Sequence, residues 1–257
     1  QIPVDAAGIE IDQLVSAVAA RGKVPKLIYV IPNFQNPTGV TLSDERRTRL
    51  IALAETWDAV IVEDDPYGEF WYGQPPPPAL RQRSDRVIYL GTFSKTIAPG
   101  LRVGWMVLPE GLMGLAMQAK ESSEVHGVRS ITRILHAAAT DYLDQHVVEA
   151  RAFYTARRDA MLDALAEYMP DGVTWTHPDG GFFAWVTLPV NLAASDLLPI
   201  AARNGVGFLP GRFFYPAAAG DDQSLRLSFS VLPAARIRAG VARLGDAIRE
   251  ASALQNA

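Results

Sequence analysis

The sequence predicts an α/β protein in which a parallel-sheet domain is followed by a smaller α+β domain. In the first half, continuous apolar runs of strand length alternate with helical periodicity, the pattern of a parallel sheet covered by helices on both faces. After a long helical pattern, the second half contains short strand candidates separated by helices. We therefore expect one domain over residues 1–140, a connecting helix over 141–169 and a second domain over 170–257.

The elements of the first half follow from periodicity, capping and turn chemistry. A helix is expected over residues 9–20, and Ser43 is a suitable N-cap for a second helix, because Asp44 and Glu45 suit its positive end. Four prolines at 75–78 predict an extended surface loop, a spacer rather than a binding site for a proline-recognising partner. Strands are expected over residues 27–31, 59–62, 87–90 and 103–108.

The second half begins with the pattern of a long helix over residues 141–168, rich in Ala, Arg and Leu. Pro170 marks its end, because proline cannot continue a helix. The remaining elements are strands near 173–176, 182–187 and 225–229 and helices near 192–204 and 234–253.

Composition and charge exclude several classes of function. The chain has 257 residues, a formal net charge of -4 and no cysteine, so disulfides, thiolate catalysis and cysteine-bound metals are excluded. No basic field is present to attract nucleic acid, and no apolar run is long enough for a membrane span. The histidines lack metal-ligand spacing, so no metal site is expected. The absence of cysteine fits a reducing compartment, and we expect a cytoplasmic protein.

Three of the predicted strands are each followed by residues with useful chemistry. In α/β sheets, ligands bind outside the carboxyl ends of the strands. The first strand is followed by the amide of Asn36, and the second by the carboxylate of Asp64 and the phenol of Tyr67. The third is followed by the hydroxyls of Thr92 and Ser94 and the amine of the adjoining lysine. This coincidence predicts a single site at one edge of the sheet.

The loop after the third strand has the composition of a phosphate site. Thr92 and Ser94 line it, and Arg102 adds a cation that can engage two oxygens at once. Lys95 beside such a site could form a Schiff base with a carbonyl cofactor. An ordinary surface lysine is the alternative, and this motif alone does not decide between them.

Several motifs, in order along the chain, resemble the signature of the class I/II aminotransferases, pyridoxal 5′-phosphate-dependent enzymes of the aspartate aminotransferase fold (fold type I). The resemblance extends from about Val4 to Ala253 and is nearest to the branch of α-aminoadipate, kynurenine and aromatic aminotransferases. It implies part of the large parallel-sheet domain and a smaller C-terminal domain. The motifs are Asn36-Pro37-Thr38-Gly39, Asp64 with Tyr67, Ser94-Lys95 and Arg102.

The resemblance implies roles for the residues that face the cofactor. Lys95 would hold it covalently and, once released, move a proton from the substrate Cα. Asp64 would keep the ring nitrogen protonated. A turn carboxylate is the alternative for Asp64, and Asp65 competes for the same role.

Other matching positions would complete the cofactor site. Asn36 and Tyr67 would hydrogen-bond the phenolic oxygen, and the Asn36–Pro37 bond is expected to be cis. The alternative for the asparagine motif is a common turn. Thr92, Ser94 and Arg102 would bind the phosphate, although Arg102 could also be an ordinary arginine at a sheet end.

The substrate side of the site is expected in the second half. Arg226 lies in an apolar strand, so it needs a partner, and the resemblance implies that it binds the substrate α-carboxylate beside Asn36. A structural salt bridge is the alternative. Residues 180–185 and 209–213 resemble the substrate-side loops of the family, and Arg212 is a candidate to contact a distal acidic group of the substrate.

The resemblance implies an aminotransferase that exchanges an amino group between an amino acid and a 2-oxo acid, with 2-oxoglutarate as the expected acceptor, and that works as a homodimer. Gln1 matches the middle of the family fold, so we expect a C-terminal portion of a longer chain. One alternative is the effector-binding domain of a GntR/MocR-type transcription regulator. Another keeps the cofactor but catalyses β-elimination or decarboxylation.

Overall fold

A computed structural model describes residues 2–216 and 222–255. Their contacts divide the chain into two compact units. The sheet unit comprises Ile2–Asn33 and Thr41–Ala150, and the C-terminal unit comprises Phe34–Val40 and the chain from Arg151 onward. This division concerns contacts only, and the domain limits at residues 140 and 170 stay a prediction.

The sheet unit contains the helices and strands expected from the sequence, with additions. Ser43 caps its second helix, since its hydroxyl accepts a hydrogen bond from the Arg46 amide. The hairpin near the N-terminus and the two helices after the sheet were not expected. In chain order the elements are β1 (Val4–Asp5), β2 (Gly8–Ile9), α1 (Ile11–Arg21), β3 (Leu27–Val30), α2 (Asp44–Thr56), β4 (Val60–Asp64), β5 (Val87–Thr92), β6 (Gly104–Val107), α3 (Met113–Ser123) and α4 (Arg129–Asp141).

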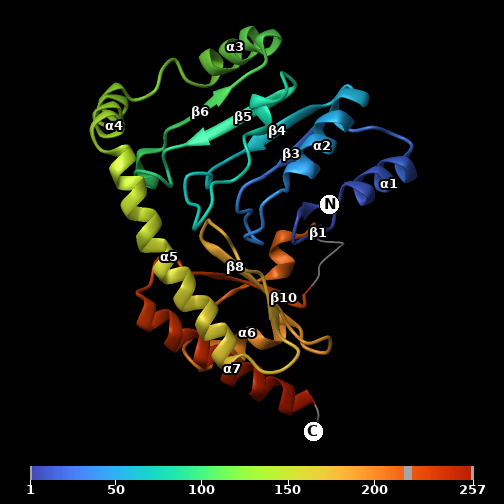
Figure 1. Ribbon diagram of the computed structural model, residues 1–257, viewed down its shortest axis with the longest axis vertical. Helices are drawn as coiled ribbons and strands as arrows, with labels where there is room; N and C mark the ends of the chain where they lie inside the picture. The colour runs from blue at the N-terminus through green and yellow to red at the C-terminus, as the bar shows by residue number, and fades with distance from the viewer. Residues whose placement is uncertain (1, 217–221, 256–257) are drawn as a thin grey trace. The chain divides into compact units, whose positions relative to one another are not determined.

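The main sheet has the strand order β3-β4-β5-β6, which Figure 1 shows as neighbouring arrows from blue to green. The first three strands are parallel, as predicted, but β6 runs antiparallel to β5, with Thr92 paired to Gly104. The expectation of a wholly parallel sheet was therefore wrong. Only residues 93–103 join β5 to β6, and that connection contains no α-helix that could make a parallel crossover.

The core of the sheet unit lies on one face of this sheet. Ile28, Ile61 and Val87 pack there with Leu50 of α2 and Ile11 of α1. Such packing gives roughly 1.5–3 kcal/mol for each fully buried side chain.

The opposite face of the sheet is partly exposed in this chain. Tyr29 is 54% exposed and Met106 is 56% exposed. Helices α1 and α2 pack on the core face, whereas α3, the first α-helix after β6, has no buried residue, so the expected helical cover of the second face stays a prediction. Apolar residues on both faces of a strand show that cover is needed, but not which segment provides it.

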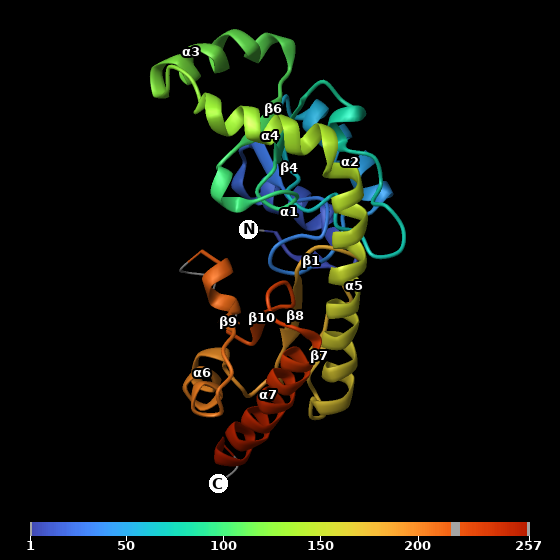
Figure 2. The ribbon, with the colours of Figure 1, turned by 90° about the vertical axis from the view of Figure 1, so that its left-hand side faces the viewer.

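The C-terminal unit contains a second sheet, antiparallel throughout, with the strand order β7-β8-β10-β9. Figure 2 shows α7 beside the lower part of α5, and Arg238 of α7 forms an ion pair with Glu167 of α5. The short strand β9 was not expected, because it has two residues and one is proline. The elements are α5 (Leu143–Tyr168), β7 (Thr174–Trp175), β8 (Phe183–Thr187), α6 (Ala194–Arg203), β9 (Leu209–Pro210), β10 (Ser224–Ser228) and α7 (Ala234–Gln255).

Among residues 2–216 and 222–255, no helix combines the length and the apolar character needed to cross a bilayer.

Candidate active site

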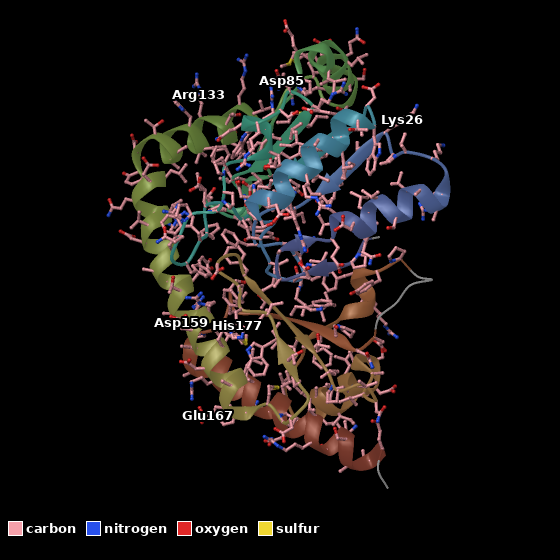
Figure 3. The ribbon with its side chains drawn as sticks, turned by 45° about the vertical axis from the view of Figure 1, so that its right-hand side comes forward. Lys26, Asp85, Arg133, Asp159, Glu167 and His177 are labelled. Carbon is pink, nitrogen blue, oxygen red and sulfur yellow. The ribbon has the colours of Figure 1, made fainter. Side chains whose placement is uncertain are left out.

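The carboxyl ends of three parallel strands meet at one edge of the main sheet. Asp64 is the last residue of β4 and pairs with Leu90 of β5, and Thr92 ends β5 two residues later. Because side chains alternate along a strand, Asp64 and Thr92 lie on the same face. Lys26 and Asp85, labelled in Figure 3, precede β3 and β5 and mark the opposite side of the sheet, where the amino ends of these strands lie. The strand ends are therefore neighbours in space, as predicted.

The loop between β5 and β6 holds the predicted phosphate-binding residues. Its base is closed by a hydrogen bond of 3.2 Å from the Phe93 amide to the Val103 carbonyl. The Thr92 hydroxyl accepts from the Ser94 amide at 3.0 Å, which folds the first turn of the loop. Arg102, at the other end, has a left-handed backbone with φ of 55°. Residues other than glycine rarely adopt this backbone conformation, and where they do, it is often at a functional site.

The two cations of this loop have no acidic partner in the described ranges. Lys95 is exposed and forms no hydrogen bond or ion pair there. Arg102 donates one hydrogen bond, of 3.3 Å, to the Pro99 carbonyl of its own loop. Two cations close in sequence to the hydroxyls of Thr92 and Ser94 have the chemistry of an anion site.

Asp64 is held by a phenol from the neighbouring strand. The hydroxyl of Tyr29 on β3 donates a hydrogen bond of 2.5 Å to Oδ2 of Asp64. Loss of water around the hydroxyl, together with this hydrogen bond and the carboxylate charge, raises the pKa of Tyr29, and Tyr67 adds to the rise. The tyrosine therefore stays a donor at neutral pH.

Asp65, the competing carboxylate, is engaged elsewhere. The Tyr89 hydroxyl donates to its Oδ2 at 3.2 Å. Burial raises the pKa of the Asp65 carboxyl. Tyr89 lies in β5 opposite Glu63, on the other face of the sheet from Asp64. This arrangement favours Asp64 over Asp65 for the predicted role.

A buried arginine, which the sequence analysis missed, supports the strand ends. Arg47 of α2 is fully buried, and burial lowers its pKa. Its spacing to Leu50 and Ala54 on the apolar face of α2 was a signal that could have found it. It donates to Oδ1 of Asn33 at 2.6 Å and to the carbonyls of Leu42, Pro32 and Pro78.

Glu63 is a second buried charge at this edge of the sheet. Its carboxylate accepts hydrogen bonds of 2.9 Å from the amides of Leu80 and Arg81, just after the proline run. Burial raises the pKa of Glu63. Together, Glu63 and Arg47 hold the loop between β4 and β5.

In the C-terminal unit, Arg226 and Asn36 are direct neighbours. Nη1 of Arg226 donates to Oδ1 of Asn36 at 2.6 Å. The guanidinium also lies over the rings of Phe183 and Phe214, with 4.1 and 5.0 Å to the ring centroids. The Asn36–Pro37 bond is cis, as expected.

Two glycines let the segment Phe34–Val40 pack closely on β8. Gly181 has φ of 71°, and a Cβ there would lie 2.8 Å from the Cβ of Phe34. Gly39 has φ of 73°, and its Cβ would meet the Phe183 carbonyl at 2.6 Å. Real Cβ atoms do not approach so closely, so both positions need glycine.

The predicted site residues therefore form two groups. The sheet unit carries Asp64, Tyr67, Thr92, Ser94, Lys95 and Arg102. Tyr67 is 5% exposed. The C-terminal unit carries Asn36 and Arg226, and it also carries Arg212, which lies over the Phe213 ring. Within these groups, hydrogen bonds join Ser94 to Thr92 and Arg226 to Asn36, and Asp64 lies on the same sheet face as Thr92. The functional roles stay predictions.

Comparison with known proteins gives a match over most of the chain. The sequence model of the family described as "Aminotransferase class I and II" matches residues 3–244. An aromatic-amino-acid aminotransferase 1 of Thermococcus litoralis is 42% identical over 97% of this chain and 61% of its own length.

A solved structure gives the same result. It is a kynurenine aminotransferase of Pyrococcus horikoshii, in complex with PMP and with KYN and KYA as substrates and products. It superposes with a TM-score of 0.91 at 41% identity, over 97% of this chain and 63% of that one. This chain therefore spans about three-fifths of the length of these relatives.

A regulator is also among the relatives. The HTH-type transcriptional regulator YisV of Bacillus subtilis, described as uncharacterized, is 33% identical over 87% of this chain and 46% of its own length.

Proposed function

This chain belongs to the aminotransferase class I and II family and has its fold, and on that premise we propose that the full-length protein is a pyridoxal-phosphate-dependent aminotransferase. It would move an amino group between an amino acid and a 2-oxo acid, for which 2-oxoglutarate is our proposed acceptor. One observation carries the proposal. Lys95, unpaired among the described residues, shares a loop with Arg102 and two hydroxyls beside the Asp64 strand end.

The residues fit this cofactor by the chemistry of their donors. An aldehyde needs a free amine, which Lys95 offers, and a phosphate needs cations and hydroxyls, which Arg102, Thr92 and Ser94 offer. A pyridine nitrogen needs an acid, and the Asp64 carboxylate lies on the same sheet face as Thr92.

Bound pyridoxal phosphate would supply a reactive aldehyde and a ring that accepts electrons from the substrate Cα. The residues of this chain would do the rest. Nζ of Lys95 would hold the cofactor and then take the proton from the substrate Cα. Asp64 would hold the proton of the ring nitrogen, and Tyr67 would hydrogen-bond the phenolic oxygen.

The C-terminal unit would bind the substrate. Arg226 would bind the substrate α-carboxylate through two hydrogen bonds from its planar guanidinium. Because Oδ1 of Asn36 accepts from Arg226, its amide nitrogen remains the donor for a ligand. We propose aromatic amino acids and aminoadipate as the amino donors. We also propose that the full-length protein forms a homodimer and lies in the cytoplasm.

Borohydride trapping on the full-length protein tests this function. The wild type should retain a covalently attached pyridoxyl group on the peptide that contains Lys95, and the Lys95→Ala variant should retain none. Lys120→Ala is the matched control, because Lys120 lies on the exposed face of α3 and pairs with Glu124. Trapping on the Lys95→Ala variant, or no trapping on the wild type with added cofactor, would overturn the proposal.

A second candidate is the effector-binding domain of a GntR/MocR-type regulator, which the similarity to YisV favours. A basic winged-helix segment in the full-length protein, with DNA binding and no amino-group transfer, would support it. Product analysis with several amino acids would also separate transamination from β-elimination and decarboxylation.

A further inference from the structure

The hydrogen bond between Tyr29 and Asp64 links two strands at the edge of the main sheet. Tyr29 pairs with Val62 in β4, and Asp64 lies two residues further along the same strand. The alternation of side chains therefore places Tyr29 and Asp64 on one face, as diagonal neighbours. The bond from the phenol to Oδ2 is 2.5 Å long, short for a hydroxyl and typical of a charged acceptor.

From this geometry we propose that Tyr29 is a positioning residue, which fixes the Asp64 carboxylate so that its other oxygen faces the cofactor ring nitrogen. This proposal rests on the function proposed above. Within the described ranges, Oδ2 of Asp64 is engaged by Tyr29 and no hydrogen bond engages Oδ1. The phenol thus selects which oxygen remains for a ligand.

The phenol also limits the orientations that the Asp64 carboxylate can adopt. A carboxylate oxygen aimed at the ring nitrogen would accept a charge-assisted hydrogen bond from it, and this contact would keep the proton on the ring. The raised pKa of Tyr29 keeps its hydroxyl protonated throughout the neutral range, so this donor is not lost with pH.

The chain contains a second tyrosine–aspartate pair that serves as a matched control. Tyr89 donates to Asp65 at 3.2 Å from the other face of the same sheet. Tyr29→Phe and Tyr89→Phe each remove one hydroxyl and one hydrogen bond to a carboxylate. Only the first bond involves the residue proposed to face the ring.

The experiment uses the full-length protein with pyridoxal phosphate labelled with nitrogen-15 in the ring. The nitrogen chemical shift reports whether the ring is protonated, and titration of the apoprotein gives the cofactor Kd. For Tyr29→Phe we expect a shift toward neutral pyridine and a Kd raised about tenfold, the effect of one hydrogen bond to a charged group. Tyr89→Phe should leave both values at those of the wild type.

Two further measurements keep the outcomes distinct. Asp64→Asn sets the shift expected when the acid is lost, and the melting temperature of each variant shows that it folds. If the folded Tyr29→Phe variant keeps the wild-type shift and Kd, the positioning role is wrong, whereas the aminotransferase function stands. If the wild type binds no pyridoxal phosphate, the proposed function itself fails.

Discussion

Nη1 of Arg226 donates a hydrogen bond of 2.6 Å to Oδ1 of Asn36, a residue 190 positions earlier in the chain. The bond joins β10 to the segment that leaves β3, and it orients the Asn36 amide. It also gives the Arg226 guanidinium, a charge in an apolar strand, one hydrogen-bond partner. For its remaining donors, a structural salt bridge is the alternative to binding the substrate carboxylate.

Replacing Arg226 with lysine should weaken substrate binding while the cofactor stays bound. Lysine keeps the charge but loses the planar fork, the bond to Asn36 and the stacking on Phe183. We expect kcat/KM to fall about 100-fold, mainly through KM for both the amino acid and the 2-oxo acid. Arg238→Lys, on the surface of α7, is the control and should keep the wild-type rate. Equal rates for the wild type and Arg226→Lys would exclude the carboxylate role.

Replacing Gly181 with alanine should displace the segment Phe34–Val40. The new Cβ would combine left-handed backbone strain with overlap at Phe34, for a total of about 2–4 kcal/mol of unfolding free energy. Gly172→Ala separates the two causes, because Gly172 has φ of 84° but its Cβ would lie 3.5 Å from Pro189, an ordinary contact. That variant should lose only about 1 kcal/mol in urea unfolding. Equal losses for both variants would contradict the proposed overlap.

Replacing Arg47 with methionine should strongly destabilise the sheet unit. The change leaves Asn33 and three carbonyls without their donor and leaves Glu63 without a nearby cation. Removing one partner from a buried charged network costs about 3–5 kcal/mol. Arg49→Met on the same helix removes an exposed ion pair with Asp12 and should unfold close to the wild-type denaturant midpoint. A midpoint for Arg47→Met equal to that of Arg49→Met would contradict this account.

Asp65 should make the stability of the wild type fall as the pH rises from acid. Burial raises its pKa above the usual 3.8, so above that pH the folded state binds more protons than the unfolded state. The free energy of unfolding contributed by this group therefore decreases from about pH 3.8 up to the folded pKa. Asp65→Asn removes the effect. The free energy of unfolding of the wild type minus that of the variant, measured by urea unfolding between pH 4 and 7, should therefore decrease as the pH rises. A difference that rises with pH would show that the sign is wrong.

Local features explain why much of the fold could be predicted. Apart from the N-terminal hairpin, α3, α4 and β9, the strands and helices were predicted to within a few residues, because apolar runs, the Ser43 cap and the prolines act over short distances. The chemistry of the strand ends followed for the same reason, since Asp64, Thr92 and Lys95 each come shortly after an apolar run. The direction of β6 was mispredicted, because an apolar strand has the same pattern in either direction.

By itself, the sequence determined the order of most of the elements, the family and the residues that could bind a cofactor, since these depend on neighbours along the chain. Only the tertiary structure decided which partners those residues have. The bonds from Tyr29 to Asp64 and from Arg226 to Asn36, and the burial of Arg47, join segments 14 to 190 residues apart. Such pairs depend on strand register and on the close approach at glycines, which no local pattern of residues records.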